Sequence, residues 1–401
     1  MNVVFPNDAM QLEPLGQESF LDDHAVFKQT YPNIAQYSIN PFVIDLTRFK
    51  LIIRRRPNGE QNKTLNEILN ANEMIKTLHV EIDPIADDDL DWEIGDYWLY
   101  ECRHLEHVTF NDPQGTIVKV GDWWLDECTA LESVDFTGLI KLKEVGHWWL
   151  HWCTALSKVE FTGLGQLKEI GRFWMSDCTS LTTVDFSGLD QLTTVRWNWL
   201  SECTALTTVN FTGLKKLQDV GQFWLYLCTA LTTVNFTGLN KLQNVGHGWL
   251  CDCTTITSAD FTALNELQMV GSGWMQGCTA LTAVDFCGLT QFVKVGRGWL
   301  VDCKALTTVD FTALNQVQEV DSHWLGDSKS LATVLFDNYT TFEIWFHNLD
   351  LRLWDEGIER LPLDDDRVSK IRCNSLAAVA TMKGMYSQWD DNEAVNQVLR
   401  T

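Results

Sequence analysis

The stretch that decides the fold is Val220 to Asn244, VGQFWLYLCTALTTVNFTGLNKLQN, because near copies of it precede and follow it at a fixed spacing. A repeat of this size is typical of a solenoid, in which each unit stacks on the next. The array begins at Ile94, and the later copies follow after one step of 26 residues and eight steps of 25. They start at Val120, Val145, Ile170, Val195, Val220, Val245, Val270, Val295 and Val320. About ten coils are therefore predicted.

One part of the unit has the alternation of a β-strand. In Leu231 to Thr237, Val234 and Phe236 would point to one side of the strand, and Thr233 and Asn235 to the other. The apolar side is predicted to face the core and the polar side to face solvent. Stacked coils then bring these strands together as a parallel sheet on one face.

The rest of the unit has longer apolar spacings. Leu239 and Leu242 are three residues apart, which suits a tight connecting arm. Val220, Trp224 and Cys228 are four residues apart, which predicts a short helical turn opposite the strand. The predicted fold class is therefore an α/β solenoid.

The cysteines follow the repeat. Nine of the twelve occupy one repeat position: Cys102, Cys128, Cys153, Cys178, Cys203, Cys228, Cys253, Cys278 and Cys303. Neighbouring coils about 4.8 Å apart would lie within disulfide reach, so bridges are the alternative interpretation. A single position repeated through nine coils is better explained by a small, buried, reduced thiol. Ser328 takes this place in the last coil.

The ends of the chain lack the repeat and are predicted to be caps. In the first segment, Thr47 to Ile53 predicts a strand, Pro57-Asn58-Gly59 a turn, and Thr64 to Ala71 a short helix. In the last segment, alternation near 342–353 predicts closing strands, and 375–386 and 392–399 predict helices. The predicted domains are an N-terminal cap region at 1–74, a solenoid at 75–342 and a C-terminal cap at 343–401.

Composition narrows the class of partner. The chain has 54 acidic and 30 basic residues and a net charge of −24, which repels nucleic acid and anionic lipid. No apolar run approaches the roughly 20 residues that a membrane helix needs, so no membrane insertion is predicted. The first residues lack the basic and apolar regions of a signal peptide. A cytoplasmic location is expected, and the cell surface is the alternative.

The repeat resembles the BspA-type leucine-rich repeat, whose units run roughly L-x-x-I-x-I, a short arm, and I-G-x-x-A-F-x-x-C. Here LTTVNF at 231–236 and VGHGWLCDC at 245–253 show the same order, with Trp-Leu or Trp-Met where the family usually has Ala-Phe. The resemblance covers about residues 75 to 342. It implies a right-handed, curved leucine-rich-repeat solenoid used for binding, often in surface proteins of microbes and protists.

The sequence shows no catalytic set of nucleophile, base and orienting group. His147 and His247 share one repeat position but are four coils apart, about 19 Å at strand spacing. Residues His247, Cys251 and Cys253 are close enough to suggest a metal site, but Cys253 belongs to the buried cysteine positions and the spacing is not that of a zinc site. We therefore predict no enzyme activity, no metal and no cofactor.

One outward position of the predicted strand forms a row that is mostly acidic. Like charges on neighbouring strands are mildly destabilising, so the row requires an explanation. One interpretation is a solvated polar face, and the other is a docking strip for a basic protein segment. The row consists of Asp135, Glu160, Asp185, Asn210, Asn235, Asp260, Asp285 and Asp310.

The position before the repeat tryptophan divides the array. Aromatic residues occupy it in most of the earlier coils, and Gly248, Gly273 and Gly298 occupy it later. One interpretation is that the position is half-buried or covered by the N-terminal segment. The other is an aromatic strip that contacts a partner or a second copy of the chain. Its aromatic members are Tyr97, Trp123, Trp148, Phe173 and Phe223.

These patterns together predict a non-enzymatic scaffold that binds a protein partner on its repeat surface. The alternative is a surface or structural, adhesive repeat protein. Intracellular location of the intact chain would favour the scaffold, whereas glycans on the sequon residues Asn210 or Asn235 would favour the surface protein.

Overall fold

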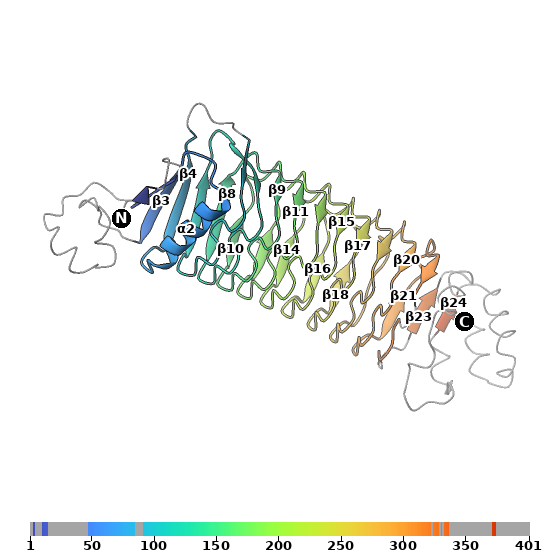
Figure 1. Cartoon of the computed structure of the whole chain (residues 1–401). Coiled ribbons are helices and arrows are strands. Elements are labelled where there is room, and N and C mark those ends of the chain that lie inside the picture. The colour runs from blue at the N-terminus through green and yellow to red at the C-terminus, as the bar shows by residue number, and fades with distance from the viewer. Residues whose placement is uncertain are drawn as a thin grey trace, which may run out of the picture. The chain divides into compact units, whose positions relative to one another are not determined.

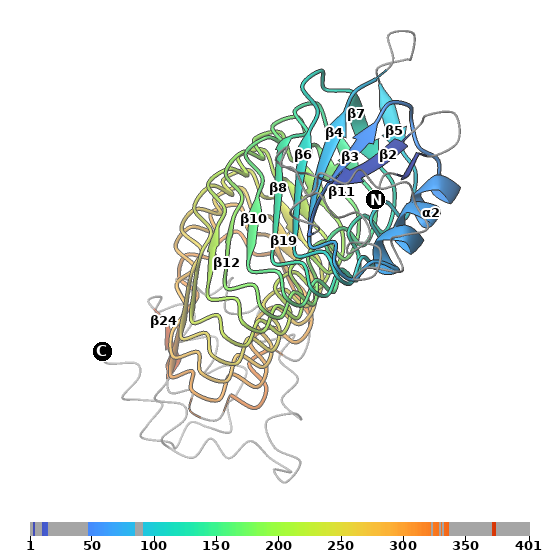
Figure 2. The ribbon, with the colours of Figure 1, turned by 90° about the vertical axis from the view of Figure 1, so that its left-hand side faces the viewer.

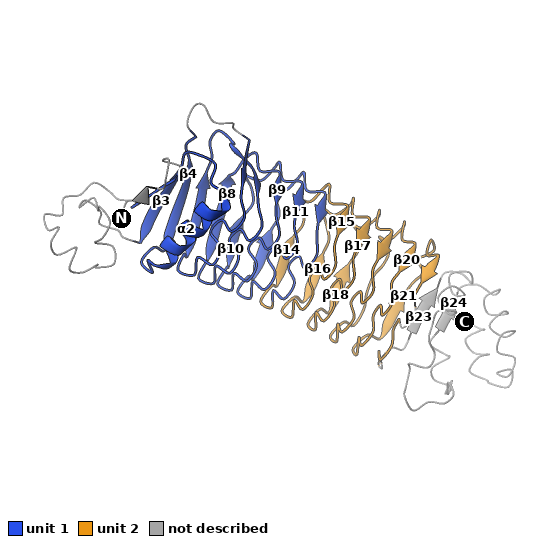
Figure 3. Ribbon diagram, viewed as in Figure 1, with its two compact units in different colours: residues 1–203 blue, residues 204–401 orange. Residues whose placement is uncertain are grey.

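A computed structural model describes residues 3–4, 10–14, 47–84, 91–321, 324–328, 330, 333–336 and 371–373. The chain divides into two compact units, residues 1–203 and 204–401 (Figure 3). The helices and closing strands predicted within 342–353, 375–386 and 392–399 lie outside the described residues. The predicted domain limits at 75 and 343 remain predictions.

Unit 1 contains two rows of strands, with successive coils contributing neighbouring strands (Figures 1 and 2). Strand β1 pairs antiparallel with β2 and β2 with β3, and from β3 onward the pairing is parallel. The first row contains β1 (Val3–Val4), β2 (Met10–Pro14), β3 (Arg48–Ile53), β4 (Thr77–Ile82), β6 (His107–Asn111), β8 (Ser133–Gly138), β10 (Lys158–Glu160) and β12 (Thr183–Asp185). The second row contains β5 (Trp92–Ile94), β7 (Ile117–Val120), β9 (Glu144–Val145), β11 (Glu169–Ile170) and β13 (Thr194–Val195).

Unit 2 repeats the same two rows with shorter strands. The first row contains β14 (Thr208–Asn210), β16 (Thr233–Asn235), β18 (Ser258–Asp260), β21 (Thr308–Asp310), β23 (Thr333–Phe336) and β24 (Ile371–Cys373). The second contains β15 (Asp219–Val220), β17 (Asn244–Val245), β19 (Met269–Val270), β20 (Lys294–Val295) and β22 (Glu319–Val320). Between regular coils, neighbouring parallel strands pair residues 25 apart in register, as in Val234 with Ala259 and Val270 with Val295. The predicted solenoid is confirmed.

The N-terminal segment begins much as the sequence predicted. Strand β3 occupies the predicted place and pairs in parallel with β4. The helix, α2 (Gly59–Asn70), begins five residues earlier than predicted because Asn58 caps it, in a capping box with Gln61. On α2, the Asn62 amide donates to the carbonyls of Gly95 and Asp96, and Asn66 donates to that of Tyr97 at 2.7 Å. The helix thus satisfies carbonyls of the first regular coil.

The core follows the predicted inward positions. In the coil that begins at Val220, the side chains of Trp224, Leu231 and Phe236 are 0% exposed, whereas Asn235 is exposed. The repeat tryptophans stack from coil to coil, with ring centroids 5.3 Å apart for Trp124 and Trp149. Aligned stacking is available because every coil places its ring at one repeat position, and aromatic pairs add to the free energy of burial.

The predicted helical turns opposite the strand are not helical, and α2 is the one α-helix among the described residues. Alternate residues in this segment are left-handed, as at Trp123 (φ 58°), Leu125 (φ 54°) and Glu127 (φ 54°). Their amides bond to other coils rather than within the segment: Trp123 donates to the carbonyl of His147, and Leu125 to that of Trp98. Apolar spacing alone cannot distinguish this arrangement from a helix, because both bury every fourth residue.

A glycine that follows the first residue of most coils permits close approach of neighbouring backbones. A Cβ added to Gly171 would lie 2.4 Å from the carbonyl oxygen of Gly146, which is inside van der Waals contact. Where Arg196 occupies this position, its amide lies 3.3 Å from the carbonyl oxygen of Ile170, compared with 3.0 Å for the amide of Gly171 and the carbonyl oxygen of Val145. The backbones there are slightly farther apart.

The described cysteines at the repeat position are free and buried, as predicted, but they also donate hydrogen bonds. The Sγ of Cys178 lies 3.1 Å from the carbonyl oxygen of Leu150 in the preceding coil. Ser328 takes this position and places its Oγ 3.0 Å from the carbonyl oxygen of Leu300. The side chain is therefore a buried donor for the carbonyl of a left-handed residue, and not only a small hydrophobe.

This hydrogen-bonding role predicts which of two substitutions at Cys178 destabilises the protein more. Cys178→Ser retains a donor and is expected to be less destabilising than Cys178→Val, which leaves the Leu150 carbonyl without its partner at a cost of about 1–3 kcal/mol. Urea unfolding of both variants measures the difference. If the side chain served only as a hydrophobe, valine would be the better replacement.

Candidate partner-binding surfaces

The outward row on the strand face lies where the sequence placed it. In unit 1, Asp135 pairs in register with Glu160 across β8 and β10. In unit 2, Asn235 is in register with Asp260, and Asp260 with Asp285. The structure thus brings like charges onto adjacent coils in both units. The side chains are outward-facing: Asp185, Asn235, Asp260, Asp285 and Asp310 are exposed, and Asp135, Glu160 and Asn210 are half-buried.

Asp and Asn can both occupy this row because their side chains perform the same backbone function. The Oδ1 of Asp260 accepts from the amide of Thr262 at 2.9 Å, and that of Asn235 accepts from Thr237 at 2.8 Å. Each side chain closes the turn two residues after it, which is an Asx turn. Glu160 has a longer side chain and instead pairs with Lys158 at 3.0 Å. Equivalent turn bonds are made by Asp135, Asp185, Asn210, Asp285 and Asp310.

A hollow of about 350 Å³ lies on this face of unit 2 and is lined by Asn235, Ala259, Asp260 and Asp285, among others. Ala259 takes the inward strand position that Val234 and its counterparts take in the other coils, and it is 5% exposed. The hollow is therefore formed mainly by the outward polar side chains of neighbouring strands. Among the described residues, no cationic side chain pairs with Asp260 or Asp285.

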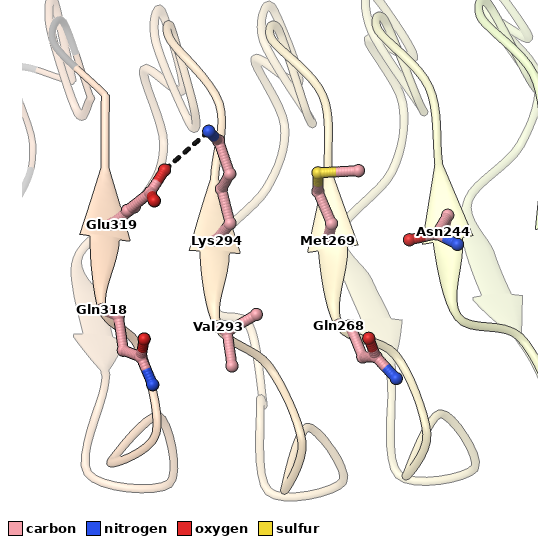
Figure 4. A pocket seen from close by; sticks show the side chains of 7 residues that line it. All are labelled: Asn244, Gln268, Met269, Val293, Lys294, Gln318 and Glu319. Carbon is pink, nitrogen blue, oxygen red and sulfur yellow. Dashed lines mark ion pairs between the residues drawn. The ribbon is translucent and has the colours of Figure 1, made fainter.

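A second hollow, of about 220 Å³, lies on the other row of strands in unit 2 (Figure 4). Lys294 and Glu319, on β20 and β22, form an ion pair at 2.6 Å there. The side chain of Met269 is 40% exposed beside them. Because the local charges neutralise each other, this hollow lacks the unpaired charge of the first.

The predicted aromatic strip is a continuous stack in unit 1. Tyr97, Trp123, Trp148 and Phe173, here called the aromatic row, have nearly parallel rings with centroids 4.6, 4.9 and 5.7 Å apart. All four side chains are half-buried. In unit 2, Phe223 is 38% exposed, and its ring lies 2.7 Å from where a Cβ of Gly248 would be.

The fold does not require aromatic side chains at this position. The four residues of the aromatic row have φ between 57° and 63°, a left-handed conformation that costs a non-glycine residue about 1–2 kcal/mol. Gly248, Gly273 and Gly298 take the same position with φ of 71–75° and avoid that strain. Each stacked pair contributes about 0.5–1.5 kcal/mol beyond burial, so stacking offsets the strain only in part.

A row of carboxylates runs beside the aromatic row. One repeat position is acidic in four of five successive coils, and Trp152 occupies it in the middle coil. The four acidic members, here called the acidic turn row, are Glu101, Glu127, Asp177 and Glu202. Partial burial and then the charge of Asp126 raise the pKa of Glu127, and partial burial and then Asp177 raise that of Glu202. Arg103 lies 3.4 Å from Glu101 and 3.8 Å from Glu127.

A partly buried ion cluster joins the two rows. The Nδ1 of His151 lies 2.8 Å from Oδ1 of Asp126, and its Nε2 lies 3.6 Å from Oδ2 of Asp177. Burial alone would lower the pKa of His151, but the hydrogen bonds and charges of the two carboxylates outweigh it and raise the pKa to about 9. The imidazole is therefore protonated at neutral pH. Its ring also contacts that of Phe173, with centroids 5.8 Å apart.

Asp126, His151 and Ser176 occupy one repeat position in successive coils, which is the composition of a hydrolase triad. The geometry differs from a triad in two ways. Both ring nitrogens of His151 face carboxylates, and Ser176 is 0% exposed. The cluster is thus a partly buried ion network in which both ring nitrogens of His151 face carboxylates.

Two other histidines have structural roles. The Nδ1 of His147 accepts from the amide of Arg172 at 2.9 Å, and that of His247 accepts from the amide of Ser272 at 2.8 Å. Each thus ties its coil to the next. No group of three or more His, Cys, Asp or Glu side chains within the described ranges suits a metal ion. In the same ranges, no helix is long and apolar enough to span a bilayer.

The repeats match a known family of proteins. Residues 92–221 and 218–345 match the BspA type leucine-rich-repeat region, which is defined by six copies of the repeat. A search of curated proteins gave no match.

Several solved structures are similar. A leucine-rich-repeat protein from Bacteroides ovatus is 18% identical over 66% of this chain and 73% of its own, with a TM-score of 0.40. A leucine-rich cell-surface protein from Faecalibacterium prausnitzii is 12% identical over 84% and 89%, with a TM-score of 0.38. The functional domain of InlJ from Listeria monocytogenes, which includes a cysteine ladder, is 16% identical over 68% and 69%, with a TM-score of 0.23.

Proposed function

Because the chain belongs to the BspA-type leucine-rich-repeat family, we propose that it is a non-enzymatic scaffold that binds a basic protein segment along the strand face of unit 2. Repeat proteins of this family commonly mediate protein interactions or act at cell surfaces. The observation that carries the proposal is the hollow at Ala259, which lies beside Asp260 and Asp285.

The chemistry of the hollow favours a lysine or arginine side chain. Asp260 and Asp285 use Oδ1 to close their turns, and they lie in register on adjacent coils without a cationic partner in the described residues. Two such carboxylates repel each other, and a cation between them relieves that repulsion. The net charge of −24 adds long-range attraction for a basic partner.

The test uses a short arginine-rich peptide as the probe and measures its affinity at several salt concentrations. The variant Asp260→Asn, Asp285→Asn, Asp310→Asn keeps each Oδ1 acceptor and removes only charge, so we expect an unperturbed fold and about tenfold or greater loss of affinity. Its dependence on salt should also weaken.

A matched control removes the same charge elsewhere in unit 2. Asp252→Asn, Asp321→Asn and Asp327→Asn lie off the strand face and should leave affinity nearly unchanged. If the control variant and the strand-face variant lost the same amount of peptide affinity, net charge alone would explain the loss. Unchanged affinity and salt dependence in the strand-face variant would contradict the proposal.

The second candidate is a surface or adhesive repeat protein. It is supported by the family's common occurrence at cell surfaces and by Asn210 and Asn235, sequon residues that face outward on β14 and β16. Fractionation of cells that make the chain separates the two. Intact chain in the cytoplasm would favour the scaffold, and glycans on Asn210 or Asn235 would favour the surface protein.

A further inference from the structure

We propose that the turn side of unit 1, formed by the aromatic row and the acidic turn row, binds a basic amphipathic segment of a protein partner. Apolar side chains of that segment would contact the aromatic row, and its lysines or arginines would contact the carboxylates. The inference rests on the proposed scaffold function but concerns a surface separate from the strand face.

Backbone strain is the first observation that supports this surface. Trp123 and Trp148 have φ of 58° and 57°, whereas Gly248 and Gly273 take the same repeat position at no steric cost. The fold therefore accepts glycine here, and unit 1 retains bulky rings in a strained conformation. Left-handed residues recur in every coil, as at Leu125, so the distinguishing feature of unit 1 is the choice of bulky rings where glycine is accepted.

The exposed part of the aromatic row determines what can contact it. Rings stacked 4.6–5.7 Å apart cover one another's faces, so the four residues present mainly ring edges to solvent. Such a strip suits the methyl and methylene groups of a peptide better than a sugar ring, which would need an open aromatic face. Trp152, whose side chain is 51% exposed, adds apolar surface in the acidic turn row.

Specific contacts make the two rows one surface. At one end, the ring of Tyr100 lies 5.5 Å from that of Tyr97, and its hydroxyl donates to Glu101 at 2.7 Å. At the other end, His151 contacts both Phe173 and Asp177. A bound segment can therefore reach the apolar and the acidic rows together.

The charge on this surface is incompletely neutralised. Its carboxylates are those of the acidic turn row and Asp126, and the cations paired with them are Arg103 and His151. Glu202 has no ion pair among the described residues. A cationic partner would relieve the repulsion that remains, which is the charge complementarity that selects a basic segment.

The chain already places its own cations on aromatic rings of this unit. The Nζ of Lys63 lies 5.3 Å from the ring centroid of Tyr97, and the guanidinium of Arg172 lies 4.2 Å from that of Trp197. These are cation–π distances. They show the type of contact that lysine or arginine of a partner would make with the open ring of Trp152.

The test compares three short synthetic peptides with the full chain by isothermal titration: alternating Leu-Lys, alternating Ser-Lys and alternating Leu-Glu. The Leu-Lys peptide should bind at least about tenfold more tightly than either of the others. The variant Trp123→Gly, Trp148→Gly, Phe173→Gly introduces the residue that three later coils have at this position, and it should lose most of that advantage. Glu127→Gln with Glu202→Gln should weaken the salt dependence of binding.

The controls are matched by position. Phe223→Gly makes the same change in unit 2, and Asp252→Asn with Asp302→Asn removes two charges from the equivalent acidic position there; both should leave binding unchanged. Circular dichroism verifies folding, and the two glutamine substitutions provide a test that does not depend on the glycine variant. Equal binding of the Leu-Lys and Ser-Lys peptides, or full affinity in a folded glycine variant, would overturn the inference.

The strand-face variant of Asp260, Asp285 and Asp310 separates this inference from the proposed function. Loss of Leu-Lys binding in that variant alone would overturn the turn-side surface and support the strand face. Loss in the glycine and glutamine variants alone would support the turn side. No loss of Leu-Lys binding in either set would overturn the turn-side surface, and the arginine-rich peptide tests the strand face separately.

Discussion

Replacing Trp149 by alanine is expected to lower the free energy of unfolding by about 3–5 kcal/mol, the range for a fully buried aromatic side chain. The indole is 0% exposed and stacks between Trp124 at 5.3 Å and Trp174 at 5.4 Å. It also contacts the rings of Phe136 and Phe161. Truncation would leave a cavity between coils held apart by their own backbones, so collapse could fill little of it.

Urea unfolding followed by circular dichroism measures this loss. The matched control is Trp152→Ala, which removes the same side chain three residues later, where it is 51% exposed. We expect that control to change stability by no more than about 0.5 kcal/mol. Similar losses in both variants would contradict the assignment of the tryptophan stack to the core.

Raising the pH from about 6.5 to above 9 is expected to remove the stabilisation contributed by His151. Its folded pKa of about 9 lies above the ordinary value of 6.5, so the contribution is complete below pH 6.5 and is lost as pH rises through 9. The shift corresponds to about 3 kcal/mol. Burial outweighs the pairing of Asp126 with His151, so the pKa of Asp126 stays above its ordinary value.

The variant His151→Gln isolates the contribution of His151 to the free energy of unfolding. It cannot titrate, and it leaves Asp126 and Asp177 without a cation, so we expect lower stability than wild type at pH 6.5. The difference between the two proteins should shrink as pH approaches 9.5, while other titrating groups cancel in the comparison. A difference that stays constant across this range would show that His151 is not the titrating group.

Particular residues show how far the sequence predicted the fold. Alternation in Leu231 to Phe236 correctly separated inward from outward side chains, because strand geometry has a period of two. The four-residue spacing of Val220, Trp224 and Cys228 was wrongly interpreted as helical. It identified the buried residues but not the left-handed backbone between them, which appears in the sequence only as the glycines of three later coils.

The sequence predicted which positions form the candidate surfaces, but only the contacts in the structure explain what those side chains do. The row through Asp260 was correctly placed outward, yet its turn-closing hydrogen bonds were missed, although the exchange of Asp for Asn at two members was a signal for them. The ion cluster of Asp126, His151 and Asp177 was missed altogether. Its members are 25 and 26 residues apart, and aligning the coils by position would have brought them together.

The sequence by itself determined the coil and the set of side chains that faces the core. A position repeated through ten coils must satisfy the same packing demand each time, so its chemistry is visible without coordinates. Only the tertiary structure decided how each coil joins its neighbours: which amide meets which carbonyl, which rings stack and which carboxylate lies beside which histidine. These contacts join residues about 25 apart, and they depend on register and on backbone handedness, for which residue type alone is a weak guide because most side chains tolerate more than one local conformation.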